Sequence, residues 1–325
     1  MTYAIQIHKT GGPDVLSWEE YDPGTPGQGE VRIIHEAVGL NFIDVYHRTG
    51  LYPLSSFPAV LGLEGAGKID MVGEGVTEFT KGDRIAYAGG PPGAYSEMRC
   101  IPAHRLVKLP EAVSTHDAAG MMLQGMTARY LLRGCYNVQP ESTLLIHAAS
   151  GGVGSILCQW ARHIGATTIG TVGSREKAEI AKKNGCTHTV LYREEDFAAA
   201  VKEITKGQGV DVVYDSVGQA TFMKSLDCLR PLGTMVSFGQ SSGPVEPFNI
   251  GVLGAKGSLF LTRPSLMQYT AKREDLVAHA QDLFDVITAG AVKINIMQEY
   301  ALKDTAQAHR DLEARKTTGS TILLP

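Results

Sequence analysis

The sequence predicts an α/β protein, in which a doubly wound parallel sheet follows a smaller and largely β unit. Between residues 143 and 262, apolar strands alternate with amphipathic helices, a pattern that favours parallel strands joined by crossover helices. Residues 1 to about 120 are instead rich in glycine, proline and short β-like runs. The chain of 325 residues also exceeds the usual size of one domain, so we expect two.

The first region contains β-like runs separated by turn signals. Turn residues such as "GGPD", "PGTPGQGE" and "KGDR" separate these runs, which indicates antiparallel or barrel-like pairing. The pattern changes near Ala118, where "AAGMMLQGMTARYLLRG" has apolar residues at helical spacing and predicts a helix at a domain junction. The runs are "AIQIH", "EVRIIHEAVGL", "AGKIDMVG", "DRIAYAG", "AYSEMRCI" and "RLVKL".

The central region reads as six strands with helices between them. After Gly290, two short strands around one helix form a tail that could complete the first domain. We therefore expect a first domain of residues 1–122 completed by 293–325, and a second domain of residues 123–292. The predicted strands are 143–149, 167–173, 187–192, 210–218, 233–239 and 257–262, and the predicted helices are Val153–Ile164, Arg175–Asn184, Glu194–Thr205, Ala220–Leu229 and Arg273–Ala289.

Composition excludes several classes of function. A formal net charge of -4 provides no general cationic field, so nucleic acid is an unfavourable partner. The sequence contains no run of about 18 apolar residues, so it predicts no membrane helix. The five cysteines are scattered and form no CxxC pair, which favours packing roles in a reducing, cytoplasmic location.

The stretch "LLIHAASGGVGS" at 144–155 combines a strand, a glycine turn and a helix start. This context is typical of a dinucleotide fingerprint. Gly151 and Gly152 would allow the turn and the close approach of a pyrophosphate, and Gly154 would allow tight packing of helix on strand. The amide groups and dipole of the helix would hold the anion. A tight turn without a ligand is the alternative.

The segment "TVGSREKAE" ends the second predicted strand, where NAD-binding folds usually place an acidic residue. Gly173 and Ser174 occupy the tip instead, and Arg175 and Lys177 follow. Small residues leave room for a 2′-phosphate and the cations can neutralise it, so NADPH is the expected cofactor. A solvated helix face is the alternative reading of Arg175 and Lys177.

Several stretches resemble the medium-chain dehydrogenase/reductases, and more narrowly the zeta-crystallin type of NADPH-dependent quinone oxidoreductase. The resemblance runs over essentially the whole chain. It implies a GroES-like β-barrel catalytic domain, built from both chain ends, around a Rossmann domain, with the cofactor in the cleft between them. The stretches are "VGLNFIDVYHRTGLYP", "LGLEGAGKIDMVGEGV", "GDRIAY", "HAASGGVGSILCQWARHIGATTIGTVGS" and "VVYDSVG".

Departures from the zinc-dependent relatives indicate chemistry without a metal. Asn41 and Leu63 stand where those enzymes have a cysteine and a histidine, and neither can replace the ligand. The structural zinc needs four close cysteines, and only Cys100 is present in that region. The acceptor must then be electron-poor, such as a quinone or an activated enone, and catalysis reduces to positioning.

The resemblance also implies site residues. Asn41, Tyr46 and Tyr52, in a predicted loop, would be catalytic, although Tyr52 has simple packing as an equal alternative. His47 is expected to be an exposed loop residue. The implied cofactor-binding residues are Asn41, Phe42, Tyr46, Thr127, Gly151, Gly152, Val153, Gly173, Ser174, Lys177, Tyr192, Ser216, Val217, Phe238, Gly239, Ser241, Thr262, Arg263 and Pro264.

Three further residues have two readings each. Asp215 lies in the predicted strand 210–218, beside the predicted cofactor edge, where it could act as a general base, although capping a turn is the favoured role. Arg315 and Lys316 could approach the cofactor, and surface charge is the alternative, favoured for Lys316.

The leading function is a zinc-independent NADPH-dependent quinone reductase. An NADPH-dependent reductase of enones or 2-alkenals is the first alternative, and an NADPH-binding protein of AU-rich RNA is the second. A zinc alcohol dehydrogenase is opposed by Asn41 and Leu63. The apolar strand 257–262 would leave an exposed sheet edge unless it is covered, so we expect a homodimer.

Overall fold

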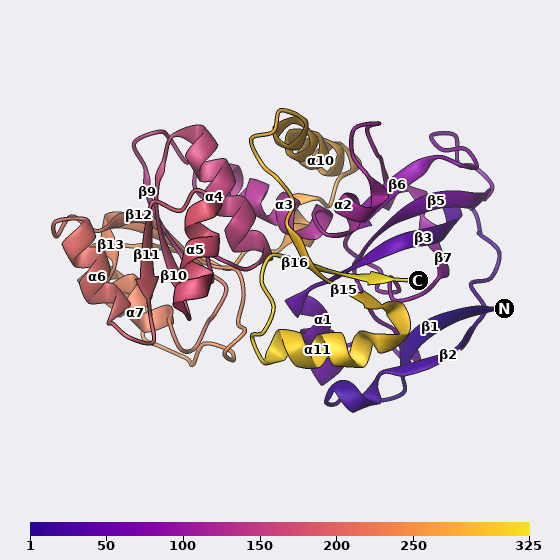
Figure 1. The fold of residues 1–325 in the computed structure, drawn as a ribbon, viewed down its shortest axis with the longest axis horizontal. Coiled ribbons are helices and arrows are strands. Elements are labelled where there is room, and N and C mark those ends of the chain that lie inside the picture. Colours follow the sequence, from indigo (N-terminus) through magenta and orange to yellow (C-terminus); the bar gives the residue numbers. More distant parts are fainter. The chain divides into compact units, whose positions relative to one another are not determined.

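The computed structural model describes all residues from Met1 to Pro325. The chain forms two compact units (Figure 1). Unit 1 comprises residues 1–126, 269–288 and 294–325, and unit 2 comprises residues 127–268 and 289–293. No helix is both long enough and apolar enough to cross a bilayer.

Unit 2 contains a parallel six-stranded sheet, which confirms the predicted doubly wound fold. The strand order is β11-β10-β9-β12-β13-β14, and every neighbouring pair is parallel. Successive strands run outward from β9 in one direction and from β12 in the other, so the order reverses between these two strands. Such a reversal is where open α/β sheets bind ligands. The strands are β9 (Thr143–Ile146), β10 (Thr167–Val172), β11 (His188–Leu191), β12 (Val210–Asp215), β13 (Leu229–Ser237) and β14 (Phe260–Thr262).

Helices cover both faces of this sheet (Figure 1). Helix α8 was not predicted, and two others differ from the prediction by more than one residue. Helix α6 begins at Phe197 and not at Glu194, because the Asp196 side chain accepts hydrogen bonds from the amides of Ala198 and Ala199 and caps the helix there. Helix α7 is shorter than expected at both ends. The helices are α4 (Gly152–Ile164), α5 (Arg175–Lys183), α6 (Phe197–Ile204), α7 (Phe222–Leu226) and α8 (Gly251–Ala255).

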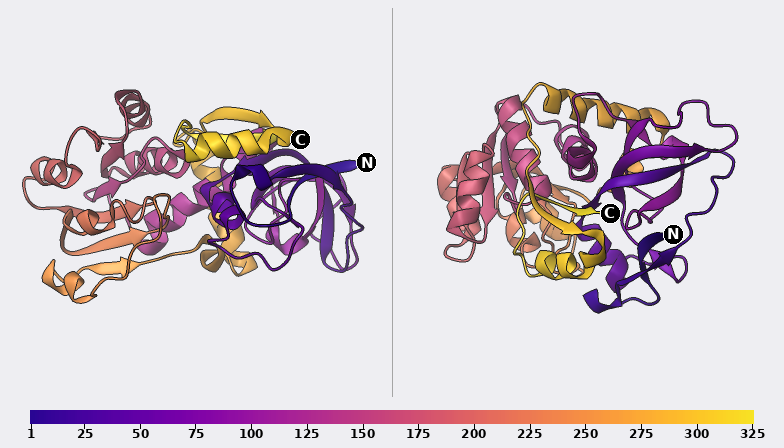
Figure 2. Two further views of the ribbon diagram at one scale, coloured as in Figure 1. Left: turned by 90° about the horizontal axis from the view of Figure 1, so that it is seen from below. Right: turned by 45° about the vertical axis from the view of Figure 1, so that its right-hand side comes forward.

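Unit 1 contains the barrel-like sheet expected of the first region. The order is β15-β16-β3-β5-β6-β8, with β7 also paired to β3. The C-terminal strand β16 runs antiparallel to β3, with Thr321 opposite Leu40, so the C-terminal segment completes the sheet of residues 30–108 (Figure 2). The strands are β3 (Glu30–Leu40), β5 (Glu64–Val72), β6 (Arg84–Ala88), β7 (Met98–Pro102), β8 (Val107–Lys108), β15 (Ile296–Ala301) and β16 (Ser320–Leu324), beside a small sheet of β1 (Thr2–Ile7), β2 (Ser17–Tyr21) and β4 (Ala59–Val60).

The helix predicted from Ala118 onwards is divided in two. Helix α2 ends at Ala119 and helix α3 begins at Met122. A side chain at Gly120, between them, would lie 3.2 Å from atoms of Ile296 and Ser320, so the chain passes close to β15 and β16 there. The helices of this part are α2 (Thr115–Ala119), α3 (Met122–Tyr130) and a π-helical turn (Leu131–Cys135).

Three other helices contribute to unit 1. Helix α10 lies within this unit, whereas the predicted boundaries place its residues in the second domain. Its Arg273 donates to the His104 carbonyl over 3.2 Å, and its Leu283 packs against Gly125 so closely that a Cβ there would approach to 2.5 Å. The helices are α1 (Phe42–Thr49), α10 (Arg273–Thr288) and α11 (Thr305–Glu313), and a short helix α9 (Leu266–Tyr269) precedes α10.

Candidate active site

The glycine turn of unit 2 joins β9 to α4 with no room for side chains. A Cβ on Gly154 would lie 2.3 Å from the Ala148 carbonyl oxygen and 2.8 Å from Ala149 Cα. Ala148 itself has a positive φ of 53°, so the turn is tight on both sides. The glycine therefore lets the helix pack directly on the strand, as the fingerprint predicts.

The start of α4 is open to an anion. Gly151 is its N-cap residue, no side chain caps the helix, and its first turn contains no acidic residue. A helix N-terminus has free amide groups and a partial positive charge. This end of α4 therefore fits a phosphate group.

The tip of β10 contains no carboxylate. Ser174 caps α5, since its hydroxyl accepts a hydrogen bond from the Lys177 amide at 3.3 Å. A Cβ on Gly173 would lie 3.0 Å from the Tyr192 hydroxyl, so the Tyr192 side chain lies directly against Gly173. Arg175 extends into solvent, where it pairs with Glu194 at 3.1 Å.

The loops after β12, β13 and β14 are tied together by hydrogen bonds. Asp215 Oδ1 accepts from the amides of Val217 and Gly218 at 2.7 and 3.0 Å, and its Oδ2 accepts from the Thr221 hydroxyl at 2.8 Å. This buried carboxylate holds a turn, which confirms the capping interpretation. Arg263 donates to the Ser237 carbonyl at 2.8 Å, which joins the end of β14 to that of β13.

The predicted cofactor-binding residues of unit 2 therefore share one edge of the sheet. Apart from Thr127, which lies in α3, each is at or just beyond the carboxyl end of a strand. Ligands of doubly wound sheets bind at this edge. In strand order, the residues are Tyr192 after β11, Gly173, Ser174 and Lys177 after β10, Gly151, Gly152 and Val153 after β9, Ser216 and Val217 after β12, Phe238, Gly239 and Ser241 after β13, and Thr262, Arg263 and Pro264 at the end of β14.

In unit 1, the segment predicted as a loop after Asn41 is a helix. The Asn41 amide donates to Asp44 Oδ2 at 2.9 Å, which closes the first turn of α1, and Gly50 ends the helix with a φ of 85°. The loop prediction was wrong because this capping pair was overlooked. His47 lies on α1 and is half-buried, so the expectation of an exposed loop residue was also wrong.

Aromatic rings gather along α1 and the loop after it. The ring centroids of Phe42 and Tyr46 lie 5.4 Å apart, and those of Tyr46 and Tyr52 lie 5.1 Å apart, both edge to face. The His47 ring lies 5.9 Å from Tyr52, and the Tyr52 amide donates to the Tyr46 carbonyl at 3.0 Å. The structure thus brings together the tyrosines that the sequence singled out, beside Phe42.

Asn41 lies in a buried polar group that includes Glu64, a residue missed in the sequence. Asn41 Nδ2 is 2.6 Å from Glu64 Oε2, and Gln124 Nε2 is 3.2 Å from Asn41 Oδ1. The other carboxyl oxygen of Glu64 accepts from the Leu123 amide at 2.8 Å. Burial raises the pKa of Glu64 to about 8. A glutamate at the start of a strand, within "LGLEGAG", was the only sequence signal for this position.

A second buried group holds α1 from its other side. Arg48 Nη1 donates to His309 Nδ1 at 2.9 Å, His309 Nε2 lies 3.1 Å from the Tyr95 hydroxyl, and that hydroxyl donates to Asp44 Oδ2 at 2.8 Å. Glu313 neutralises Arg48 through two bonds of 2.8 and 2.9 Å. Burial, and then the Arg48 charge, lower the pKa of His309 to about 3, whereas burial raises that of Asp44 to about 7. His309 is therefore neutral at pH 7.

The remaining predicted positions do not join these groups. Leu63 is a buried core residue, and no group of three or more histidine, cysteine or acidic residues is arranged to hold a metal ion. Lys316 is on the surface, where it pairs with Asp311 at 3.2 Å, which confirms the surface interpretation.

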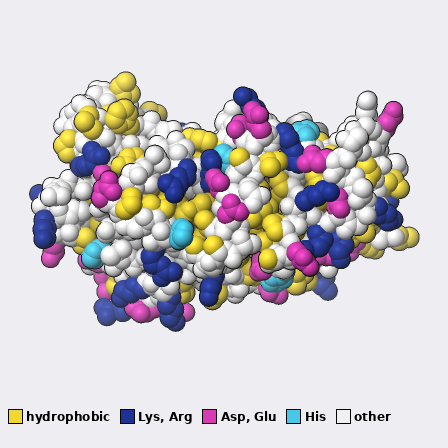
Figure 3. Space-filling view, turned by 90° about the horizontal axis from the view of Figure 1, so that it is seen from above, with side chains coloured by type: hydrophobic (Ala, Val, Ile, Leu, Met, Phe, Trp, Pro, Cys, Tyr) yellow, Lys and Arg dark blue, Asp and Glu magenta, His cyan; other side chains and the backbone are white.

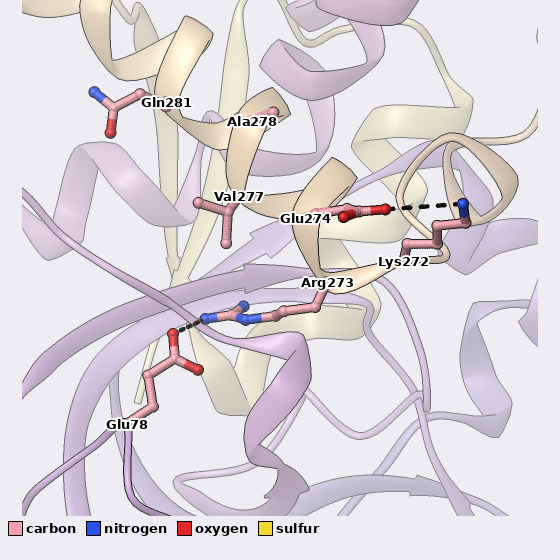
Figure 4. Close-up of a pocket in the computed structure, with 7 residues that line it drawn as sticks. All are labelled: Glu78, Lys272, Arg273, Glu274, Val277, Ala278 and Gln281. Carbon is pink, nitrogen blue, oxygen red and sulfur yellow. Dashed lines mark hydrogen bonds and ion pairs between the residues drawn. The ribbon is translucent and has the colours of Figure 1, made fainter.

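A separate surface pocket in unit 1 lies beside α10 (Figure 4). Arg273 forms an ion pair with Glu78, and Lys272 lies 3.8 Å from Glu274. Each cation in this pocket thus has an acidic partner within it. The pocket contains none of the predicted site residues.

Two protein families match separate parts of the chain. Residues 27–111 match the alcohol dehydrogenase GroES-like domain, and residues 152–281 match the zinc-binding dehydrogenase family. The chain is 50% identical to a quinone oxidoreductase of Pseudomonas aeruginosa, with all of both chains aligned. It is also 48% identical to a 2-haloacrylate reductase of a Burkholderia species, over 100% of this chain and 99% of that one.

A solved structure is equally similar over its whole length. The crystal structure of Escherichia coli quinone oxidoreductase complexed with NADPH matches with a TM-score of 0.98 and 48% identity, and covers 100% of both chains. Full-length identity at this level, together with the Rossmann sheet and the GroES-like unit, shows that the chain belongs to the zeta-crystallin-type quinone oxidoreductases of the medium-chain dehydrogenase/reductase family.

Proposed function

We propose that this protein is an NADPH-dependent quinone reductase that works without zinc. The observation that supports it most is the full-length similarity to quinone oxidoreductases, one of them solved with NADPH at a TM-score of 0.98. Both units take part in that similarity, so it includes the acceptor side as well as the cofactor side.

The residues of unit 2 fit the cofactor. The uncapped start of α4 at Gly151, Gly152 and Val153 would hold the pyrophosphate. Gly173 and Ser174 leave space for the 2′-phosphate, and the Lys177 ammonium would offset its charge. Tyr192 would lie beside the adenine. NADPH supplies the hydride when it is bound.

Further contacts at the same edge would follow the order of the strands. The loops after β12 and β13 would contact the middle of the cofactor. The end of β14, together with Asn41, Phe42, Tyr46 and Thr127, would contact its nicotinamide end. The loop residues are Ser216, Val217, Phe238, Gly239, Ser241, Thr262, Arg263 and Pro264.

Residues of unit 1 would hold the acceptor. Tyr46 and Tyr52 offer aromatic edges and phenolic donors, and the Asn41 amide offers a further donor. A quinone accepts hydride readily because the product anion is delocalised, so positioning and a few hydrogen bonds suffice. Asn41 and Leu63 are not zinc ligands, which supports a reaction without that Lewis acid.

Steady-state kinetics test this function. Oxidation of NADPH should be rapid with a small quinone, and treatment with a chelator should leave kcat/KM unchanged. Loss of turnover after chelation, restored by added Zn²⁺, would contradict the proposal. Tyr46→Phe and Tyr52→Phe should each raise KM for the quinone if their hydroxyls contact it.

Reduction of an activated alkene is the second candidate. The 48% identical relative is named a 2-haloacrylate reductase, and such an acceptor needs the same fold and cofactor. A short enone and a 2-haloacrylate, measured beside the quinone under the same conditions, separate the two. A higher kcat/KM for either alkene would favour this candidate.

Binding of AU-rich RNA has no comparable support. Basic and acidic side chains are interspersed on the face shown in Figure 3, without a broad field of one sign. RNA recognition usually requires clustered cations with exposed aromatic rings. An RNA gel shift that weakens with salt would revive this function.

We also propose a homodimer formed through the edge of the unit 2 sheet. Strand β14 is the last strand of the sheet, and its Phe260 and Leu261 are 61% and 38% exposed. Leu232 and Ile250 in the same unit are 58% and 75% exposed. An uncovered apolar edge invites strand pairing, so Phe260→Lys should convert the dimer to a monomer in light scattering. An unchanged mass would contradict this interface.

A cytoplasmic location accompanies this function. None of the five cysteines forms a disulfide, as in proteins of reducing compartments. Fractionation of the source cells would test it.

A further inference from the structure

Four side chains of unit 1 form a continuous chain of hydrogen bonds that ends on a backbone carbonyl oxygen. Glu64 Oε2 is 2.6 Å from the amide of Asn41, and that amide is 3.2 Å from the amide of Gln124. Ser320 Oγ is 2.8 Å from the Gln124 amide and 2.6 Å from the Gly120 carbonyl oxygen. The two amides can each face either way, because their oxygen and nitrogen are interchanged by a half-turn.

The direction of this chain is set at Ser320. A serine hydroxyl has one proton, and Ser320 Oγ lies close to two groups. The Gly120 carbonyl can only accept, so the Ser320 proton must go to it for a separation of 2.6 Å to be favourable. Ser320 Oγ must then accept from Gln124, which turns its NH2 group towards the serine.

That orientation propagates to Glu64. Gln124 now presents its oxygen to Asn41, so Asn41 must donate with Nδ2 and turn Oδ1 towards the carboxyl group. A carboxyl oxygen can bond to an amide oxygen only if it is protonated. The separation of 2.6 Å between the Asn41 amide and Glu64 Oε2 agrees with a protonated carboxyl group. It is short for N–H···O bonds of about 2.7–3.2 Å and normal for O–H···O bonds.

The surroundings of Glu64 also favour the neutral acid. Its side chain is fully buried, and a Cβ on Gly39 would lie 2.2 Å from Oε2, so backbone packs directly on the carboxyl group. Burial is the largest effect on the pKa of Glu64 and raises it to about 8; a hydrogen bond from Asn41 would oppose the rise only in the reverse orientation of its amide, the one from the Leu123 amide opposes it in either, and Asp44 adds to it.

No cation faces the carboxyl group to offset this burial. The causes that shift its pKa include no lysine, arginine or histidine. Arg99 lies over the Tyr87 ring, 5.5 Å from its centroid, and Arg48 is paired with Glu313. The cations on the neighbouring strands have other partners, since Arg32 on β3 pairs with Asp70 and Arg84 on β6 donates to the Val113 carbonyl. The titratable and charged groups on the elements around β5 are Asp44, Tyr46, His47 and Arg48 on α1, Glu30, Arg32, His35 and Glu36 on β3, Arg84 and Tyr87 on β6, Tyr95 in the segment before β7, His116 and Asp117 on α2, and Arg129 and Tyr130 on α3.

We propose that Glu64 is a positioning residue for Asn41: it holds a proton, donates it to Asn41 Oδ1, and so fixes the direction of the Asn41 amide. Asn41 keeps one N–H and one oxygen lone pair that take no part in these hydrogen bonds. If all the hydrogen bonds of the chain reverse direction, this N–H and this lone pair exchange positions. The state of Glu64 therefore determines where Asn41 can donate to the carbonyl oxygen of an acceptor. This consequence rests on the proposed function, in which Asn41 contacts the acceptor.

Infrared spectroscopy of the cofactor-free protein tests the proton directly. At pH 7, the wild type should show the carbonyl stretch of a protonated carboxylic acid that Glu64→Gln lacks. Asp44→Asn is the matched control, because Asp44 is the other buried carboxyl group nearby and its loss should leave the Glu64 band in place. A Glu64→Gln spectrum without any lost band would overturn the proposal.

Ser320→Ala tests the direction of the chain by the sign of a shift. If Ser320 accepts from Gln124, its loss weakens the protonated state, and the pH at which the Glu64 band disappears should fall. If Ser320 instead donates to Gln124, its loss weakens the ionised state, and that pH should rise. An unchanged or higher midpoint would overturn the proposed direction.

The pH dependence of acceptor binding tests the consequence. Above pH 8 the wild-type KM for the quinone should rise several-fold while kcat changes less, and Glu64→Gln should show no such rise, since its amide still donates to Asn41. An equal rise in Glu64→Gln would contradict the positioning role. Absence of quinone turnover in the wild type would refute the proposed function, whereas the infrared band would still decide the state of Glu64.

Discussion

The two units build their candidate sites in different ways. In unit 2, the predicted residues follow successive strands of one sheet and meet at its carboxyl edge. In unit 1, the residues that meet are far apart in the sequence: Glu64 and Ser320 are linked through Asn41 and Gln124. The first kind of site follows from strand and helix periodicity, whereas the second requires tertiary pairing of buried polar groups.

Substitution of Gly154 should have the largest effect, and it should be confined to unit 2. A side chain there would meet the Ala148 carbonyl at 2.3 Å, and backbone cannot move aside easily. Gly154→Val should destabilise the protein by about 3 kcal/mol and abolish NADPH binding, as measured by denaturant unfolding and by titration. In Gly151→Ala, the nearest atom to the new Cβ lies at 3.3 Å, so this control should lose much less stability than Gly154→Val. Equal stability of Gly154→Val would refute the packing argument.

A carboxylate at the tip of β10 should reverse the choice of cofactor. Gly173→Asp places a negative charge where the 2′-phosphate would lie, and like charges in contact cost several kcal/mol. The ratio of NADPH to NADH affinity should fall about 100-fold, or about 2.8 kcal/mol. Gly173→Asn has the same size without the charge and should keep the NADPH preference. Equal behaviour of the two variants would exclude an electrostatic cause.

Tyr95→Phe should break the second polar group of unit 1 and leave unit 2 unaffected. The hydroxyl joins Asp44 and His309, and its loss leaves both buried without this partner. The free energy of unfolding should fall by about 2 kcal/mol, whereas NADPH affinity should not change. Denaturant unfolding and cofactor titration of the same variant check both statements. A loss of NADPH affinity at unchanged stability would contradict the separation of roles.

Glu64→Gln should change how stability depends on pH. The folded pKa of Glu64, about 8, lies above its ordinary value of 4.5, so the folded state holds the proton longer than the unfolded state. The wild type should therefore lose stability relative to Glu64→Gln as pH rises from 4.5 through 8, by at most about 1.4 kcal/mol per pH unit. Urea unfolding at several pH values measures this difference, and parallel curves would contradict it.

Arg175→Ala should have the smallest effect. The side chain is 83% exposed and its ion pair with Glu194 is in solvent, so stability should change by less than about 1 kcal/mol. NADPH affinity should fall less than in Lys177→Ala, because the Lys177 side chain is less exposed. A larger loss of NADPH affinity in Arg175→Ala would make that residue the main phosphate contact.

The difference between the two units also explains which parts of the structure the sequence could predict. Strands β9 to β14, the uncapped helix α4 and the absence of an acid at Gly173 all leave local signals, and the structure places them as expected. Helix α1 was missed because "NFIDVYHRT" is short and mixes β-branched with aromatic residues, so its capping pair of Asn41 and Asp44 was the only clear signal.

The polar groups of unit 1 leave no comparable local pattern. The sequence did not predict Glu64, Tyr95 or His309 as site residues. The local sequence does not show that a polar residue is buried, or which distant residues are its partners. Likewise, Cys158 and Cys186 are 28 residues apart in the sequence, yet the thiol of Cys186 is a hydrogen-bond partner of the Cys158 thiol. Such contacts depend on how distant elements pack, which periodicity does not encode.

The central claim is that the edge of the unit 2 sheet is built for NADPH. Titration of the wild-type protein with NADPH and NADH, followed by fluorescence, tests it most directly. We predict that NADPH binds at least about tenfold more tightly, since charge-assisted bonds to the 2′-phosphate are worth more than 1.4 kcal/mol. Equal or tighter binding of NADH would contradict the assignment of Gly173, Ser174 and Lys177.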